Sequence, residues 1–385
     1  MLIGVLISSA GASMIWPFLM IYVSKKLTLP LSTVATLVSI NAATSLVAAL
    51  FAGNLTDRKG RKMVMVVSLM TNGLIYVFMS QAGTYLAFAL LMILTGASNP
   101  LYQVGADAML ADLIPPEDRT QAYALQRTVN NAGIAIGPAV GGFIASRSYT
   151  VAFMGAALGM ILYGLLMLFR ARETLTDEIR QSGVRNQNRL GGFEQVFQDQ
   201  KYLAFVSLIA LGLIAPSMMW VLLAVYTKTN FGLTESLYGW IPTTNALMCV
   251  FIQVLVTQGT RRLPRLTVST LGMLIYAIGV GSIALMSHFW GFWLSMVVIT
   301  FGELLLIPTI TTVVANYAPI EQRGRYMSVY WFGWGLARVF SPLIGGFLND
   351  SLSPRSIWIG GLVIGLSSTV GLLLFQRSKR FSISV

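Results

Sequence analysis

Residues 53–62 read GNLTDRKGRK, and this stretch decides how the chain is organised. It holds five charged residues and joins two apolar runs, at residues 33–54 and 63–82. About 20 apolar residues in a helix cross the ~30 Å hydrocarbon core of a membrane. A charged loop between two runs of that length therefore indicates a pair of transmembrane helices, with the loop at the membrane surface.

The same alternation continues along the whole chain. Of its 385 residues, 55% are hydrophobic and only 10% are charged, and the mean hydropathy is +0.72. Soluble domains carry about 25% charged residues, so we expect most of this chain to lie in lipid. We predict an all-α membrane protein with twelve transmembrane helices, near residues 1–24, 33–54, 63–82, 86–112, 121–145, 150–169, 203–226, 237–257, 266–287, 290–315, 325–348 and 356–375.

The first apolar run, residues 1–24, is predicted to be a transmembrane helix and not a signal peptide. It lacks a basic leading region and a cleavage site of small residues, and it is long enough to span. Because no polar leader precedes Leu2, we expect a few residues of the natural chain to be missing upstream.

The basic residues are expected to set the orientation of the chain in a cell inner membrane. The net charge is +12, but Lys and Arg lie in short loops and not on one amphipathic face, which argues against nucleic-acid binding. The loops of one face hold 19 Lys and Arg, and those of the other hold 5. Since basic loops stay inside, both termini are predicted to be cytoplasmic. One cysteine, Cys249, and one histidine, His288, exclude a disulfide framework and a thiolate metal site.

The chain contains an internal repeat at a constant offset of 204 residues. Residues 111–115, ADLIP, align with residues 315–319, ANYAP, and residues 141–143 and 345–347 both read GGF. No gap is needed over this alignment. A repeat of this length indicates two related halves of one fold.

The longest polar stretch, residues 170–201, lies between the two copies of the repeat. We predict two pseudo-symmetric six-helix bundles, at residues 1–170 and 202–385, joined by a cytoplasmic linker at residues 171–201. Parallel repeats of this kind place a binding site at their interface near the bilayer midplane. The architecture therefore predicts a transporter.

The loop at residues 53–62 resembles the G-x-L-x-D-R-x-G-R-[KR] signature of the major facilitator superfamily, which it matches at every fixed position. The resemblance implies the two-bundle fold of that family and a loop that latches the outward-facing state. By the same resemblance, Asp57, Arg61 and Asp112 form a charge relay that breaks and re-forms as the halves rock. The alternative is a basic loop that only fixes the topology.

Each signature residue also has a physical reason to be there. We expect Gly53 to permit close helix approach and Gly60 to make the turn. Asp57 is expected to cap the following segment while pairing with a nearby cation. Arg58 completes the signature. A loop that only fixed the topology would need neither the glycines nor the aspartate.

Residues 133–142, GIAIGPAVGG, resemble the G-x-x-x-G-P-x-x-G-G motif that the drug/proton antiporter branch of the superfamily carries in its fifth helix. Small residues four apart allow close helix approach, and a proline bends a helix. Ordinary packing of small residues is the alternative, but it leaves the proline and the paired glycines unexplained. The motif residues are Gly133, Gly137, Pro138, Gly141 and Gly142.

Met92 stands where exporters of that branch carry an intramembrane arginine, four residues before Gly96. The resemblance to bacterial multidrug exporters nevertheless covers essentially the full chain. It implies export of small amphipathic molecules, chiefly drug-like cations, by proton antiport with alternating access. A transporter of lysolipids, lipid precursors or metabolites with the same fold is the alternative.

Four charged residues lie inside predicted spans and are candidates for proton coupling: Asp107, Arg127, Glu303 and Arg338. A charge near the bilayer centre needs a partner or an aqueous cavity. With a helix rise of ~1.5 Å per residue, Asp107 and Arg127 reach similar depths, and so do Glu303 and Arg338. Each pair is therefore expected to interact. Glu303 is the favoured proton carrier, and a static structural ion pair is the alternative.

Polar and aromatic residues on the helices that line the path in such folds are expected to contact substrate. These candidates are Trp16, Asn41, Tyr102, Gln103, Asn131, Trp220, Asn245, Gln253, Tyr330 and Trp334. The sequence holds no zinc-protease motif, nucleophile elbow or phosphate-binding loop, so we do not expect an enzyme or a cofactor. The expected partners are a small-molecule substrate, protons and membrane lipid, with the protein acting as a monomer.

Overall fold

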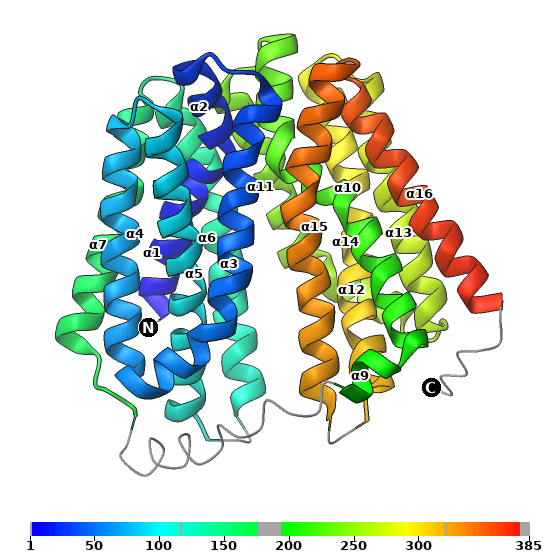
Figure 1. Ribbon diagram of the computed structural model, residues 1–385, viewed down its shortest axis with the longest axis horizontal. Helices are drawn as coiled ribbons and strands as arrows, with labels where there is room; N and C mark the ends of the chain where they lie inside the picture. The colour runs from blue at the N-terminus through cyan, green and yellow to red at the C-terminus, as the bar shows by residue number, and fades with distance from the viewer. Residues whose placement is uncertain (1, 116–117, 176–193, 320–321, 378–385) are drawn as a thin grey trace. The chain divides into compact units, whose positions relative to one another are not determined.

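The computed structural model describes residues 2–115, 118–175, 194–319 and 322–377, and these residues form helices and short connections without any strand (Figure 1). The first half comprises α1 (Leu2–Ile15), η1 (Trp16–Phe18), α2 (Leu19–Leu27), α3 (Leu31–Lys59), α4 (Arg61–Gln81), α5 (Tyr85–Leu113), α6 (Arg119–Ala145) and α7 (Tyr149–Arg170). The second half comprises α9 (Glu194–Gln198), α10 (Gln200–Phe231), α11 (Glu235–Phe251), α12 (Gln253–Thr260), α13 (Arg265–Ser282), η3 (Ile283–Leu285), α14 (Phe289–Tyr317), α15 (Arg323–Ser351) and α16 (Ser356–Arg377).

A helix or a broken helix occupies each of the predicted intervals. Nine helices within the described ranges are long and apolar enough to cross a membrane, and the bent pair α11 and α12 makes a tenth if it counts as one span. Neither α6 nor α15 reaches that level of hydropathy. Both helices begin with polar and charged residues and carry an arginine inside the predicted span, Arg127 or Arg338. Twelve spans therefore remain a prediction.

Two of the described helices are interrupted, and only one of the two interruptions coincides with a proline. The first helix passes through a 3₁₀ turn at Trp16–Phe18, where Pro17 removes a backbone donor. The chain bends by 52° between α11 and α12, at Ile252. By contrast, α6 runs unbroken through Pro138, because membrane helices can re-satisfy the backbone group that a proline frees.

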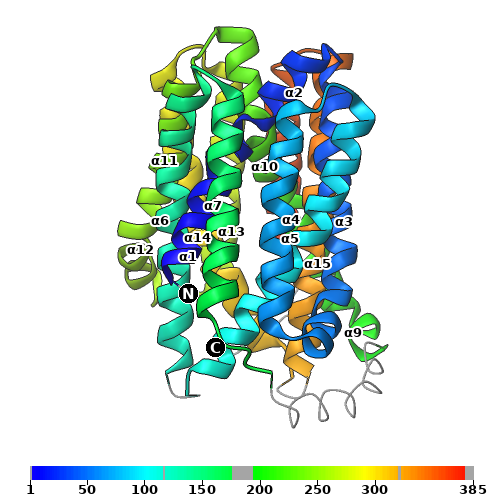
Figure 2. The ribbon, with the colours of Figure 1, turned by 90° about the vertical axis from the view of Figure 1, so that its left-hand side faces the viewer.

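The helix boundaries follow the internal repeat closely. The first residues of α4 and α13, of α5 and α14, and of α6 and α15 are each separated by 204 residues. The packing follows the repeat as well: α1 packs on α6 and α7 as α10 packs on α15 and α16, and α4 packs on α5 and α7 as α13 packs on α14 and α16. Figure 2 shows the helices α1, α4, α5, α6 and α7 of the first half. The two halves thus share boundaries and helix neighbours.

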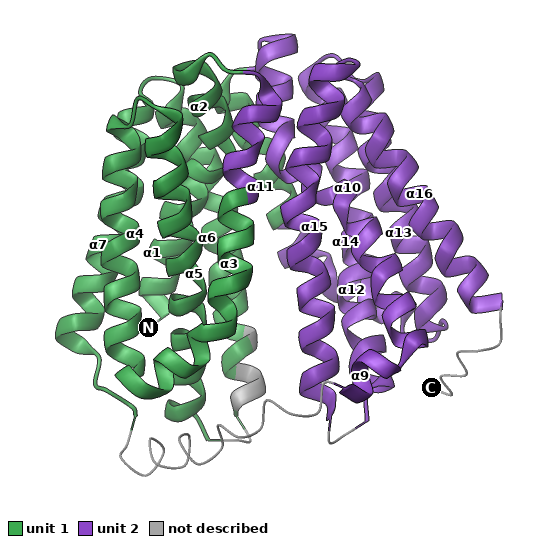
Figure 3. Cartoon of the chain, in the orientation of Figure 1, with its two compact units in different colours: residues 1–29, 40–189, 234–246 green, residues 30–39, 190–233, 247–385 purple. Residues whose placement is uncertain are grey.

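The chain divides into two compact units whose limits differ from the sequence halves (Figure 3). Unit 1 comprises residues 1–29, 40–189 and 234–246, and unit 2 comprises residues 30–39, 190–233 and 247–385. The start of α11 thus groups with unit 1, and the start of α3 groups with unit 2. The predicted bundles at 1–170 and 202–385 remain a prediction, and residues 176–193 of the predicted linker lie outside the described residues.

Close contacts at two glycines explain why the start of α11 groups with unit 1 and the start of α3 groups with unit 2. In unit 1, a Cβ atom on Gly142 would collide with the backbone of Glu235, the first residue of α11. In unit 2, a Cβ atom on Gly346 would lie 2.7 Å from the Cα atom of Ser32. The Asp350 carboxylate also accepts a hydrogen bond of 2.8 Å from the backbone nitrogen of Ser32. Only glycine allows backbones to come this close.

Candidate functional site

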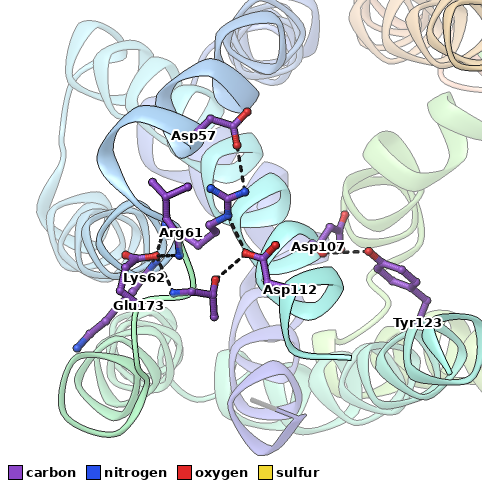
Figure 4. A network of polar contacts seen from close by, with 9 residues as sticks. Asp57, Arg61, Lys62, Asp107, Asp112, Tyr123 and Glu173 are labelled. Carbon is purple, nitrogen blue, oxygen red and sulfur yellow. Dashed lines mark hydrogen bonds and ion pairs between the residues drawn. The ribbon is translucent and has the colours of Figure 1, made fainter. Parts of the chain in front are cut away.

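The first part of the candidate site is an ion-pair cluster at the start of α4 (Figure 4). Gly60 precedes this helix with a φ of +99°, a conformation that favours glycine. Arg61 follows it, with Nη2 3.3 Å from Asp57 Oδ1 and Nε 2.9 Å from Asp112 Oδ2. The Arg61 side chain is only 6% exposed. The structure thus brings together the three residues that the sequence assigned to a charge relay.

Glu173 is a component of this cluster that the sequence analysis missed. Its carboxylate accepts hydrogen bonds from the backbone nitrogens of Arg61 (2.9 Å) and Lys62 (3.1 Å) (Figure 4). A carboxylate at a helix N-terminus satisfies free N–H groups and interacts favourably with the helix dipole. The expectation that Asp57 caps this helix is therefore wrong: Asp57 pairs with Arg61, and Glu173 provides the cap.

The residue after Glu173 extends this connection to α5. The hydroxyl group of Thr174 donates a hydrogen bond of 2.7 Å to Asp112 Oδ2, the oxygen that also contacts Arg61. A Cβ atom on Gly60 would collide with the Glu173 carboxylate, so glycine is required there for space as well as for its φ angle. The segment after α7 thus contacts the ion-pair cluster through the backbone of Arg61 and the carboxylate of Asp112.

Replacing Glu173 by alanine should lower the stability of the purified protein by about 1 kcal/mol, the usual cost of losing a helix cap. The measurement is the thermal unfolding midpoint in detergent. Glu194→Ala is the matched control, because Glu194 is an exposed acid in α9. Equal midpoints for the two variants would show that the cap contributes nothing.

The glycines of the α6 motif form a close contact with the first helix. A Cβ atom on Gly133, Gly137 or Gly141 would collide with α1, at Ser9, Ser13 and Met14 respectively. These glycines are four residues apart, so they lie along one face of α6. The glycine of the loop signature behaves differently, because a Cβ atom on Gly53 would meet nothing within 4 Å. The expectation that Gly53 permits close helix approach is therefore wrong in this structure.

The second part of the candidate site is a cavity of about 450 Å³ within unit 1. Residues of α1, α4, α5, α6 and α7 line it. The volume suits a small molecule. Most of the lining side chains are polar, and many carry amides; the polar ones are Ser8, Ser9, Asn72, Asn99, Tyr102, Gln103, Asp107, Tyr123, Gln126, Arg127 and Asn130.

Two amides hold the carboxylate of Asp107 at the cavity wall. Gln103 Nε2 and Gln126 Nε2 each lie 3.3 Å from Asp107 Oδ1. The hydroxyl group of Tyr123 donates to the backbone oxygen of Asp107 at 2.9 Å (Figure 4). Both Asp107 and Arg127 are described, and they form no ion pair. Equal depth along two helices is not sufficient for an ion pair. Successive residues on a helix point about 100° apart, and Gln126 faces Asp107 in place of Arg127.

The second predicted pair, Glu303 and Arg338, is also not brought together as an ion pair, although the structure describes both side chains. Glu303 is half-buried in α14, close enough to Tyr276 of α13 to interact with it electrostatically. Arg338 is exposed on α15. The depth argument again left out the direction of each side chain around its helix. The role of Glu303 in proton coupling stays a prediction.

Of the ten predicted substrate contacts, Tyr102 and Gln103 line the cavity of unit 1. The other eight do not line it, and some of them form hydrogen bonds elsewhere. Asn41 donates to the backbone oxygen of Met92 at 3.0 Å, and Gln253 donates to that of Leu304 at 3.1 Å. The remaining six are Trp16, Asn131, Trp220, Asn245, Tyr330 and Trp334, of which Trp334 donates to Tyr330 within α15.

The sequence analysis did not identify one buried acid, Glu235. Glu235 is 5% exposed at the start of α11, and the hydroxyl group of Tyr149 donates to it at 2.6 Å. It lies at the end of a helix, so the search for charges inside apolar runs missed it. The cavity amides Asn72 and Gln126 were missed because that search considered charged side chains first.

Comparison with known proteins agrees with the fold and the loop motif. The family model described as Major Facilitator Superfamily matches residues 1–223 and 210–383. The chain belongs to the major facilitator superfamily. It is thus a multi-pass membrane protein of a transporter family, and its relatives place it near the drug/proton antiporters.

Two relatives and one solved structure illustrate this similarity. The chain is 25% identical to the Na(+), Li(+), K(+)/H(+) antiporter of Planococcus maritimus, with 93% of this chain and 89% of the relative covered. It is 26% identical to multidrug resistance protein 2 of Bacillus subtilis, with 88% and 86% covered. The structure of a bacterial homolog of the human lysosomal transporter Spinster, inward-facing and unoccupied, superimposes with a TM-score of 0.82 at 12% identity, covering 100% of this chain and 97% of that one. This likeness supports the fold.

Proposed function

We propose that the chain is a secondary active transporter that exports small amphipathic molecules, chiefly cations, in exchange for protons by alternating access. The names of the two relatives, a cation/proton antiporter and a multidrug resistance protein, support this proposal. We further propose that it acts as a monomer in the cell inner membrane, with both termini in the cytoplasm. The excess of basic residues in the loops of one face favours that orientation.

One observation carries the proposal: α5 joins the cavity to the ion-pair cluster. Asp107 lines the cavity, and Asp112, five residues further along the same helix, pairs with Arg61. The backbone positions of the two residues are about 7.5 Å apart along the helix axis. Occupation of the cavity that displaces α5 also displaces Asp112 from Arg61. Substrate binding and the latch are then linked through one rigid helix.

In this proposal, one acid in each half takes part in proton coupling. Asp107 faces the cavity and exchanges a proton for a cationic substrate, while Glu303 on α14 carries the transported proton. Arg127 of α6 lines the same cavity as Asp107, and Arg338 lies on α15. Met92, at the position of the missing arginine, is buried and apolar and takes no part.

The test is efflux from proteoliposomes across an imposed pH gradient, with a panel of amphipathic cations. Glu303→Gln should abolish gradient-driven efflux, because glutamine carries no proton, while substrate binding persists. Glu194→Gln in α9 is the matched control and should transport as the natural protein does. Unchanged efflux by Glu303→Gln would remove that residue from the mechanism, and absence of gradient-driven flux for every cation would contradict antiport itself.

A second function, export of molecules with an anionic head group, is favoured by one feature of the cavity. Arg127 lines it without an ion pair to any acid among the described residues. A guanidinium group in that position can bind a phosphate or carboxylate in two-pronged fashion. Lysolipids and anionic metabolites in the same efflux assay distinguish this function from cation export.

A further inference from the structure

Two opposite charges line the cavity of unit 1 without neutralising each other. Asp107 of α5 contributes a carboxylate, and Arg127 of α6 contributes a guanidinium group. Neither group forms an ion pair with any residue that the structure describes. Both lie inside predicted membrane spans, where a charge needs either a partner or an aqueous cavity. Two such groups at one cavity point to a ligand that supplies a partner for each.

The hydrogen bonds around Asp107 leave one oxygen of its carboxylate available to a ligand. Gln103 Nε2 and Gln126 Nε2 each donate to Oδ1 at 3.3 Å. The other oxygen, Oδ2, has only a longer contact of 3.5 Å, from Gln103 Nε2. Each oxygen of an ionised carboxylate can accept about two hydrogen bonds. The two amides therefore hold the carboxylate in place, and Oδ2 keeps the capacity to accept from an ammonium group.

A ligand with a single charge would satisfy one of the two groups at the expense of the other. A molecule that fills the cavity displaces the water that solvates Asp107 and Arg127. A buried charge is costly unless it is paired. A cation bound to Asp107 would leave Arg127 with neither water nor a partner, and an anion bound to Arg127 would do the same to Asp107. Only a molecule that carries both charges leaves neither group unpaired.

We propose that this cavity binds a zwitterion, whose ammonium group pairs with Asp107 and whose carboxylate pairs with Arg127. A guanidinium group binds a carboxylate through two parallel hydrogen bonds. The inference rests on the proposed transport function and narrows its substrates, because the cations and anionic head groups considered above become two ends of one molecule. Apolar side chains of the cavity wall accept the remainder of an amphipathic molecule; these are Val5, Ala12, Leu69 and Met160.

The test is direct binding to the purified chain in nanodiscs, measured by isothermal titration calorimetry at neutral pH and without a gradient. Two zwitterions differ in the distance between their charges: phenylalanine and 4-(2-aminoethyl)benzoate. Removing the carboxylate from either gives 2-phenylethylamine, and removing the ammonium group gives 3-phenylpropionate or 4-ethylbenzoate. At least one zwitterion should bind tenfold or more tightly than both of its singly charged forms. If neither zwitterion shows that preference, or neither binds at all, the proposal is wrong.

The result can be separated from the outcome for the proposed function, since binding does not require proton coupling. Tight binding of 2-phenylethylamine without a preference for either zwitterion would overturn the zwitterion site and leave cation export in place. A zwitterion that binds with the expected preference but is not driven by the pH gradient in proteoliposomes would support the site and contradict antiport.

Two variants assign each charge of the ligand to its partner. Asp107→Asn should reduce the preference for the zwitterion over its ammonium-free form at least fivefold and keep the preference over 2-phenylethylamine. Arg127→Gln should do the reverse. Arg147→Gln is the matched control, because Arg147 is an exposed arginine just after α6 that does not line the cavity.

This crossed pattern distinguishes ligand contacts from a structural role, because a disturbed fold would lower both preferences together. Thermal unfolding confirms that each variant is folded, and the ligand series on the natural protein decides the matter if a variant does not fold. Both preferences surviving in both folded variants, or falling equally in each, would overturn the proposal.

Discussion

Replacing Arg61 by alanine should reduce transport at least tenfold and leave the protein in the membrane. Arg61 is nearly buried and pairs with both Asp57 and Asp112 (Figure 4). Removing one partner of a buried ion pair leaves the other charge without compensation. Asp112 is the more affected acid, because its side chain is 18% exposed while that of Asp57 is 52% exposed. The proposed latch then loses the contact between α4 and α5.

Initial rates of efflux from proteoliposomes, normalised to the amount of folded protein, measure this effect. Lys59→Ala is the matched control, because it removes an exposed positive charge from the same loop and leaves the cluster intact. Arg61→Lys should fall between the two, since lysine keeps the charge but not the planar fork that reaches two carboxylates. Equal losses in Arg61→Ala and Lys59→Ala would mean that the loop acts only through its net charge.

The same cluster separates what the sequence could predict from what it could not. The resemblance of residues 53–62 to the family signature implied a relay of Asp57, Arg61 and Asp112. Glu173 lies 112 residues from Arg61 in the chain, and nothing in its own neighbourhood indicates a helix cap. Capping by a distant residue depends on how two helix ends meet. That information is tertiary and cannot be read from local patterns.

The candidate pairs show a second limit of the sequence. Depth along a helix follows from counting residues, so Asp107 and Arg127 were expected at similar levels, and both line one cavity. The direction of each side chain around the helix depends on how that helix is rotated in the bundle. Each residue turns by about 100°, so an error of one position exchanges Arg127 for Gln126. The amide-lined cavity could therefore not be predicted, although the helices that form it were.

Helix positions could be predicted because they depend on many residues at once, unlike the direction of a single side chain. A predicted span rests on the mean hydropathy of about 20 residues, so one misjudged residue hardly shifts its limits. The internal repeat provided a second estimate of the helix boundaries. The polar helices α6 and α15 are the exception, because their mean hydropathy is too low to identify them as membrane spans. In α6, Arg127 lines the cavity and Gly141 lies against α1, and in α15, Gly346 lies against Ser32.

Replacing Gly141 by alanine should destabilise the protein strongly, whereas the same change at Gly53 should not. A Cβ atom on Gly141 would lie 2.7 Å from the Cα and carbonyl carbon atoms of Met14, and closer still to its oxygen. These are backbone atoms of α1, so they cannot rotate away as a side chain can. Overpacking of a core costs about 1–3 kcal/mol, and a rigid neighbour puts Gly141→Ala at the upper end of that range.

Gly53→Ala adds the same methyl group inside α3, where nothing lies within 4 Å. Alanine favours a helix by up to about 1 kcal/mol over glycine, so the unfolding midpoint should stay constant or rise. Thermal unfolding of both variants in detergent, with the folded yield, gives the comparison. Equal midpoints would show that α1 and α6 are not as close as the structure has them. A stable Gly53→Ala variant that has lost transport would instead show that Gly53 is needed in another state of the cycle, where a helix must pack against it.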